Sequence, residues 1–486
     1  MSTAEQCPQT MTHMCTRMHM RYMLVRMSIP GVLRHRAYRH LFAAQVVALV
    51  GTGLATVALG LLAFDIAGGS AGAVVGTALT IKMVAYVAIS PFAGAAAGRV
   101  PRRAMLVALD LVRGGVAVCL PFVDAVWQVY LLIFVLQAAS AAFTPTFQAT
   151  IPDVLPDERD YTRALSLSRL AYDLESLFSP MLAAALLTVV GYQQLFAGTA
   201  VGFAASALLV VSVLLPKPAP ASRREPVLRR TTLGMRIFAA TPRLRALLAM
   251  NLAVAAATSM VLVNTVVIVR EQLGRSESDV AVALGCYGAG SMVVALLLPR
   301  VLDRVGDRAV MLPAGFLLAA VLGGSAAALA LAPAATGWWV LLAAWTLLGA
   351  GTSLVLTPSS RLLRRSAGAA DRPALFAAQF SLSHAGFLAG YPVAGWLGVT
   401  AGMPVTLAVL GAAALAAGAA AALLWPSGDP VRVAHVHRNL APGHPHLVDA
   451  RSGADGGRAH THDYVIDDEH PRWPRRSDAP LVRSDA

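Results

Sequence analysis

The stretch RHLFAAQVVALVGTGLATVALGLLAFD, residues 39–65, carries no acidic or basic side chain between His40 and Asp65. As a helix rising about 1.5 Å per residue, it is long enough to cross a hydrocarbon core of roughly 30 Å. Similar apolar runs recur to about residue 425, and only 13% of the 486 residues are charged. A soluble protein of this length needs more surface charge. The sequence therefore predicts an all-α membrane protein, because alternating segments of strand length are missing from these runs.

We predict twelve transmembrane helices in two six-helix bundles. They run roughly over 41–66, 73–98, 104–122, 127–150, 164–190, 194–216, 246–269, 279–299, 309–331, 338–360, 373–398 and 404–425. The predicted domains are an N-terminal arm (1–40), a first bundle (41–216), a linker (217–243), a second bundle (244–425) and a tail (426–486). The first 27 residues hold seven of the sixteen Met. They indicate either an over-extended start, with translation beginning at Met27, or a soft-metal arm.

Arginine sets the orientation of the chain in the bilayer. The loops after the even-numbered spans are rich in Arg, whereas the opposite loops carry only Arg270 and Arg275. Positive loops face the cytoplasm, so we expect a multi-pass protein of the bacterial inner (plasma) membrane with both termini cytoplasmic. The net charge of +13 then reflects topology and contact with the lipid bilayer, and no nucleic-acid partner is expected.

The two bundles show three weak internal matches in the same order. GRVPRR (98–103) matches DRVGDR (303–308), Thr144-Pro145 matches Thr357-Pro358, and SLSR (166–169) matches SLSH (381–384). Two repeated six-helix halves imply alternating access around a site near the middle of the bilayer.

Ionisable residues inside a bilayer are costly and therefore candidates for function. Counted at about 1.5 Å per residue, Asp173 and Glu175 lie roughly 14–17 Å deep. Lys82 and His384 lie at a similar depth, about 14 and 16 Å from their helix ends. Asp173 and Glu175 are about 200° apart around their helix, and Asp173 is one turn after Arg169. We expect Asp173 to pair with Arg169, and Glu175 to face the cavity as a metal ligand, a proton carrier, or both in turn.

Four ionisable residues inside the predicted helices have a structural interpretation as well as a functional one. Asp110 and Arg113 are three residues apart and indicate a structural or gating ion pair rather than a substrate site. Lys82 is a counter-ion for a buried carboxylate or part of the transport site. His384 is an interhelical hydrogen-bond donor or a ligand or proton carrier; with Glu175 it would suit nickel, which accepts imidazole and carboxylate ligands.

The tail contains seven of the twelve His residues, six of them in three H-x-H pairs. Short His-rich tracts are typical of metal binding, and neutral imidazole is available at cytoplasmic pH. We expect a polar, mobile tail that holds a metal through His435, His437, His444, His446, His460, His462 and His470. The alternative is a passive polar end.

The chain resembles the major facilitator superfamily. GAAAGRVPRR (94–103) is similar to the family's loop after the second span, although Gly98 and Pro101 depart from that pattern, and PRVLDRVGDR (299–308) keeps Asp303, Arg304 and Gly306. The resemblance implies that spans 2 and 11, and spans 5 and 8, face each other, which would place Lys82 near His384. It also implies a role for Asp303 and Arg304 in the conformational switch. Arg99, Arg102 and Arg103 serve the same switch or set topology only.

The chain further resembles nickel-resistance permeases of the NreB type. This resemblance lies in residues 39–65, 76–94 and 143–180 and in the tail. This resemblance implies export of nickel, and sometimes cobalt, in exchange for protons. Ser179-Pro180 stands where drug antiporters of the superfamily often carry Gly-Pro, so drug–proton antiport is not implied. We expect no enzymatic activity and no cofactor, with nickel as the transported ion and a monomer as the working unit. The alternatives are efflux of a macrolide or another drug, and a non-transporting metal sensor.

Overall fold

The computed structural model describes residues 29–428 except 68–70, 98–99, 217–226 and 332–333. In the tail it describes 432–437, 440, 444–447, 451–452, 457–467 and 469–474. The predicted start at Met27 and the candidate Arg99 lie outside these residues.

Six long helices form the N-terminal half of the molecule. After a short 3-10 helix η1 (Ile29–Arg34), these are α2 (Arg36–Ala67), α3 (Ala71–Ala97), α4 (Arg102–Cys119), α5 (Val126–Val154), α6 (Glu158–Leu187) and α7 (Tyr192–Val211), with a 3-10 turn η3 (Leu120–Phe122) after α4. Asp157 caps the N-terminus of α6, where its carboxylate accepts hydrogen bonds from the backbone amides of Arg159 and Asp160.

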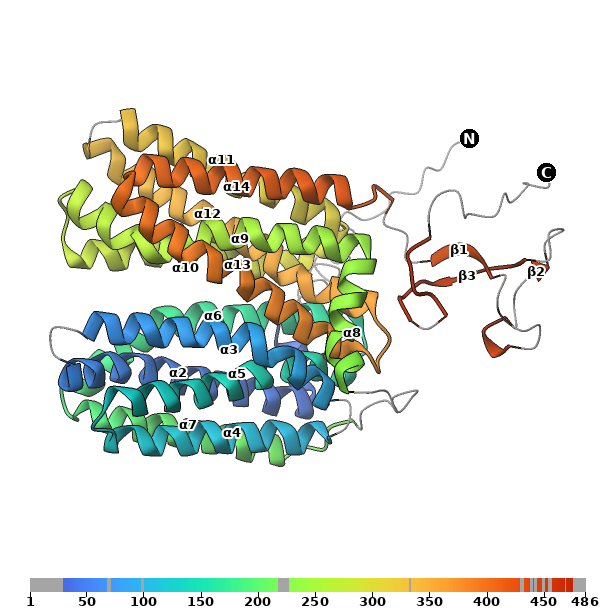
Figure 1. Cartoon of the computed structure of the whole chain (residues 1–486), viewed down its shortest axis with the longest axis horizontal. Coiled ribbons are helices and arrows are strands. Elements are labelled where there is room, and N and C mark those ends of the chain that lie inside the picture. Colours follow the sequence, from blue (N-terminus) through green and yellow to red (C-terminus); the bar gives the residue numbers. More distant parts are fainter. Residues whose placement is uncertain are drawn as a thin grey trace, which may run out of the picture.

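Six more helices form the C-terminal half. These are α9 (Pro242–Val267), α10 (Glu277–Leu302), α11 (Asp307–Leu331), α12 (Ala334–Ser366), α13 (Arg372–Thr400) and α14 (Met403–Leu424), with a single π-helical turn η4 (Ile268–Gln272) after α9. The two halves lie one above the other with their helices roughly parallel (Figure 1). The twelve helices coincide with the twelve predicted segments, with ends that differ by up to six residues. The predicted all-α fold of two six-helix halves is therefore confirmed.

Within the described residues, nine of these helices are long and apolar enough to cross a membrane by length and composition. The other three are α3, α6 and α13, and α3 contributes a shorter apolar stretch, Thr80–Ala96. These three helices carry the candidates Lys82, Glu175 and His384. They also make the main contacts between the halves, α3 with α13 and α6 with α10.

The outer surface of the bundles is apolar. Val201 is 68% exposed and Leu208 is 69% exposed on α7, and Leu423 is 88% exposed on α14. In water such side chains would favour burial, whereas hydrocarbon tails accept them. Inside each half, small residues let helices approach closely: an added Cβ at Gly349 of α12 would lie 1.9 Å from the Tyr287 carbonyl oxygen of α10.

Residues 227–240 of the predicted linker (217–243) form a helix, which corrects the expectation of a loop there. Helix α8 (Val227–Ala240) lies across the ends of the bundles near the tail and contacts α3 and α13 (Figure 1). Its apolar face buries Ile237 and Phe238 in the core of the C-terminal half. The helix therefore forms because one face has apolar surface to cover, which charge counting along the linker did not reveal.

The tail is also folded in its described parts, which corrects the expectation of a mobile segment. Strands β1 (Arg432–His437), β3 (Arg458–Asp463) and β2 (Arg451–Ser452) form an antiparallel sheet in the order β1-β3-β2, with a 3-10 turn η5 (Pro445–Leu447) between β1 and β2. Tyr464 and Ile466 are buried in the core of the C-terminal half, with Trp473 packed against it. This apolar contact anchors a segment whose average composition is polar.

Candidate functional site

The predicted pair Lys82 and His384 meets at one aromatic side chain, Tyr86, between the two halves. The Lys82 Nζ atom lies 5.6 Å from the centre of the Tyr86 ring, a cation–π contact. The His384 ring of α13 meets the same ring edge-on at 4.8 Å. His384 Nδ1 donates to the Phe380 carbonyl oxygen at 2.7 Å, which leaves Nε2 as the free ring nitrogen for a ligand or proton.

Glu175 lies at the contact of α6 with α2. An added Cβ at Gly53 of α2 would lie 2.9 Å from Glu175 Oε1, so glycine makes room for this carboxyl group. Lys82, Glu175 and His384 lie on α3, α6 and α13, so this candidate set, here called the mid-membrane polar group, includes both halves. The role of Lys82 as counter-ion to Glu175 stays a prediction.

Arg169 contacts the opposite half. Its Nε and one terminal nitrogen lie 3.2 and 3.1 Å from the Ser291 hydroxyl of α10. The side chain of Asp173 lies outside the described residues, so its pairing with Arg169 stays a prediction. The Ser291 contact was not visible in the sequence, because it depends on how α6 and α10 face each other.

Asp110 and Arg113 form the ion pair that their spacing predicts, inside the N-terminal half. Asp110 also accepts from the Ser206 hydroxyl at 2.8 Å. The Arg113 guanidinium stacks on the Phe143 and Phe203 rings, 4.0 and 4.5 Å from their centres. A buried pair whose contacts all lie within one half supports the structural interpretation.

A set of ion pairs joins the halves at the ends nearest the tail, here called the tail-side gate. Arg361 lies 2.7 Å from Glu158 and Arg372 lies 3.3 Å from Asp153, both across the halves. Arg159 lies 3.9 Å from Asp303, which gives that candidate a partner in the other half. Buried Asp307 lies 3.4 and 3.2 Å from Arg361 and Arg365.

The remaining candidates in the loops have different surroundings. Arg102 is buried and pairs with Asp153, so it supports the tail-side gate from the N-terminal half. Arg103 donates to the Val211 carbonyl within that half, and Arg304 is exposed. Five residues of these ion pairs were not predicted as site residues from the sequence: Asp153, Glu158, Asp307, Arg361 and Arg372. The available signal was the opposite charge of the loops 153–163 and 361–372.

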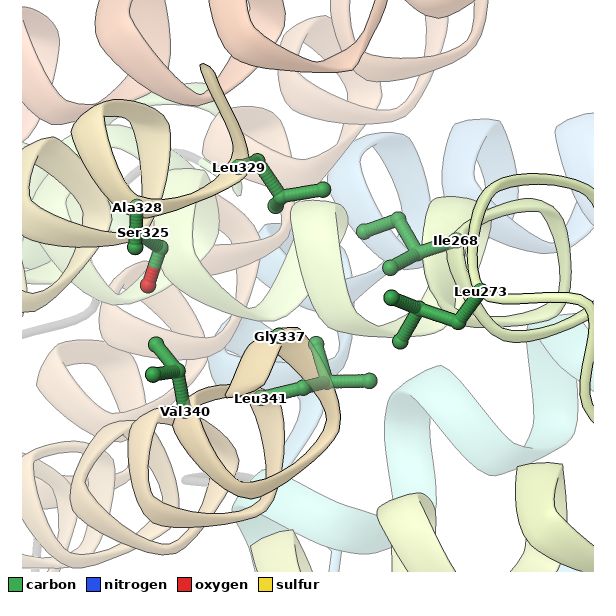
Figure 2. A pocket seen from close by; sticks show the side chains of 8 residues that line it. All are labelled: Ile268, Leu273, Ser325, Ala328, Leu329, Gly337, Val340 and Leu341. Atoms are coloured by element: carbon green, nitrogen blue, oxygen red, sulfur yellow. The ribbon is translucent and has the colours of Figure 1, made fainter. Parts of the chain in front are cut away.

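Hydrogen bonds and ion pairs between the halves, within the described residues, lie between the level of Arg169 and the tail-side ends. There Ser381 donates to the Val87 carbonyl at 2.6 Å and Ser90 donates to the Ala377 carbonyl at 2.9 Å. The molecule is therefore closed on the tail side. A small apolar pocket lies at the opposite end of the C-terminal half, and Figure 2 shows that only Ser325 brings a side-chain polar atom to it, so it is no site for an ion.

Five of the seven predicted tail histidines converge on one point. His435 and His437 come from β1, His460 from β3, His446 from the 3-10 turn and His470 from the segment after β3. One ring nitrogen of each lies within 4.8 Å of those of the other four. Antiparallel pairing places His435 directly opposite His460. We call these five residues the histidine centre.

The other two predicted histidines lie outside this set. His462 lies at its edge, with its ring 4.8 Å from those of His435 and His446. His444 lies further out, with its ring 6.5 Å from that of His446. Burial, together with the neighbouring imidazoles, lowers the pKa of His435 and of His437 to about 4. These rings are therefore neutral near pH 7, the form that binds metals.

Comparison with known proteins identifies the family. The family model of the Major Facilitator Superfamily matches residues 41–266 and 247–453. No curated protein sequence matches the chain. Among solved structures, a bacterial homologue of the iron transporter ferroportin in the outward-facing state is similar, with a TM-score of 0.67, 15% identity, and coverage of 80% of this chain and 99% of that one.

Two other structures show the same fold. A human organic anion transporter has a TM-score of 0.65 at 14% identity, covering 79% of this chain and 99% of its own. The E. coli fucose:proton symporter has a TM-score of 0.62 at 14% identity, covering 80% and 98%. With the family model matching both six-helix halves, the chain belongs to the major facilitator superfamily of membrane transporters.

Proposed function

We propose that this protein is a secondary active exporter of nickel, with cobalt as a second cargo, that expels the ion from the bacterial cytoplasm in exchange for protons. The observation that carries the proposal is the histidine centre, five converging imidazoles on the tail side of a transporter. Imidazole is a good ligand for nickel and cobalt. The resemblance to nickel-resistance permeases of the NreB type points to the same cargo.

The positive loops support an orientation in the inner membrane with the tail side in the cytoplasm. The histidine centre then lies where the cargo enters. A tethered site raises the local concentration of bound ion at the inner mouth of the transporter. The tail would thus collect nickel and present it to the path between the two halves.

The mid-membrane polar group supplies the exchange of ion and proton. Glu175 and the free Nε2 of His384 are ligands that nickel accepts, and both also carry protons. Lys82 neutralises Glu175 while the site is empty. Arrival of a divalent ion would compete with Lys82 and with protons for the same carboxylate, and this competition couples the two fluxes.

The test is uptake into everted membrane vesicles under an imposed pH gradient, with nickel, cobalt, zinc and a macrolide compared side by side. We expect nickel uptake that needs the gradient and dissipates it. Uptake of the macrolide without nickel would replace the proposal with drug efflux. Specific nickel binding without uptake of any cargo would replace it with a metal sensor.

A further inference from the structure

The protons of three tail histidines are fixed by their surroundings. His435 Nδ1 lies 3.0 Å from the Val433 carbonyl oxygen and His462 Nδ1 lies 2.8 Å from the Asp463 carbonyl oxygen. His470 Nδ1 lies 2.7 Å from Asp467 Oδ1. These oxygens only accept hydrogen bonds, so in each neutral ring Nδ1 carries the proton and Nε2 presents a lone pair.

The Nε2 atoms of the histidine centre face one another, and in the closest pair neither neutral ring has a proton on Nε2 to donate to the other. His435 Nε2 lies 3.0 Å from His470 Nε2, and both are lone-pair nitrogens. It also lies 3.1 Å from the Nε2 atoms of His437 and His460. Two lone pairs at this separation repel each other. A cation between them turns that repulsion into ligation, so the arrangement fits a metal ion better than a hydrogen-bond network.

The separations indicate a coordination geometry. Metal–imidazole bonds of about 2.1 Å place two ligands about 3.0 Å apart at right angles, and about 3.4 Å apart in a tetrahedron. Four of the separations between these Nε2 atoms are 3.0, 3.1, 3.1 and 3.2 Å, including that of His446 to His470. Five converging donors also exceed the four that zinc uses in almost all structural sites.

His462 is the candidate for a sixth donor, and because it lies outside the five whose ring nitrogens are all within 4.8 Å of one another, its ring has to move inward to ligate the same ion. Its Nε2 atom is buried and has no hydrogen-bond partner within the described part of the chain. Its ring lies 4.7 Å from that of His460 and 5.0 Å from that of His470. A buried nitrogen lone pair without a partner is costly, and a metal ion in the histidine centre would supply the missing partner.

We propose that the tail binds one divalent ion in a single six-coordinate site made by His435, His437, His446, His460, His470 and His462. Asp467 acts as a positioning residue, because its hydrogen bond holds the His470 ring and raises its basicity as a ligand. The inference rests on the proposed function for the identity of the ion, nickel. It replaces a loose collection of ligands by one site in which five donors already converge, and in which zinc would leave donors unused.

The experiment uses the purified full-length protein without an affinity tag of histidines, titrated with nickel sulfate and then with zinc sulfate. Binding stoichiometry comes from calorimetry, and the number of imidazole ligands comes from X-ray absorption at the metal edge. We expect one tightly bound, paramagnetic nickel with six nitrogen ligands, and zinc with four. Two or more nickel ions with two or three imidazoles each would overturn the proposal.

Three variants locate the site, and His444→Ala is the matched control because His444 lies outside it. His462→Ala should leave one nickel with five nitrogen ligands and one oxygen ligand from water, and His462→Asn repeats the test with a polar side chain. Asp467→Asn should lower nickel affinity about 10–100-fold with the ligand count unchanged. His444→Ala should change neither quantity, and a loss equal to that of His462→Ala would refute the assignment.

Transport measurements keep this inference separate from the proposed function. A six-coordinate nickel site in a protein whose vesicles do not accumulate nickel would leave the site intact and overturn the exporter. Nickel uptake by a protein whose tail binds no single ion in this geometry would overturn the site and leave the exporter intact.

Discussion

Arg361 of the C-terminal half lies 2.7 Å from Glu158 of the N-terminal half. The same guanidinium lies 3.4 Å from Asp307 of its own half, which is buried at the start of α11. Arg361 therefore connects the two halves through an acid on each side. Because the halves must separate here for the tail side to open, this contact belongs to the closed conformation alone and favours it.

Arg361→Gln should shift the protein toward the conformation that is open on the tail side. Partly exposed ion pairs are worth about 0.2–1 kcal/mol, so the open fraction should rise by roughly 1.4- to five-fold. Spin labels on the tail-side ends of α6 and α12, read by pulsed dipolar spectroscopy, measure it.

Arg275→Gln serves as the control for this prediction. Arg275 forms an ion pair with Asp279 at 3.3 Å inside the C-terminal half, at the opposite end of the helices. Its loss should leave the distance distribution unchanged. A distribution that is the same in both variants and in the native protein would show that Arg361 does not hold the halves together.

Glu175→Gln should abolish nickel uptake while the protein still folds. The change keeps the shape of the side chain but removes the charge that Lys82 and a divalent ion compete for, and it removes the titrating proton. Uptake into everted vesicles measures the loss, and size-exclusion chromatography in detergent checks folding. Glu271→Gln, at an exposed carboxylate in η4, is the matched control. Normal uptake by Glu175→Gln would remove Glu175 from the transport path.

Replacement of the five residues of the histidine centre by Ala should weaken nickel resistance most at low nickel concentrations. At high concentrations diffusion fills the transport path without help from the tail. Growth and cell nickel content across a concentration series measure this. The variant is better than truncation after Trp425, because truncation also removes Tyr464 and Ile466 from the core of the C-terminal half. Equal loss at every concentration would instead make the tail part of the transport path.

Gly349→Ala should destabilise the C-terminal half by about 1–3 kcal/mol, the usual cost of overpacking. The added Cβ would lie 1.9 Å from the backbone carbonyl oxygen of Tyr287, so α10 and α12 would have to move apart. Thermal unfolding in detergent measures the effect. Gly323→Ala on α11 is the control, because an added Cβ there has no atom within 4 Å. Equal melting temperatures for all three proteins would contradict the close helix contact.

The sequence by itself determined the helices and their grouping. Apolar runs of sufficient length, such as residues 39–65, can only be helices in lipid, since every backbone polar group must be satisfied within the segment. The i,i+3 spacing of Asp110 and Arg113 likewise predicted their ion pair, because one helix fixes their separation. The H-x-H pairs predicted a metal-binding tail from composition alone.

Only the tertiary structure decided which of these residues meet. Five His residues converge because antiparallel pairing of β1 and β3 brings positions 25 residues apart, such as His435 and His460, to one point. The tail folds because Tyr464 and Ile466 find apolar surface on the C-terminal half, which no local pattern shows. The contacts of Arg361 with Glu158 and of Arg169 with Ser291 join the two halves, so they depend on the docking of two bundles rather than on spacing along the chain.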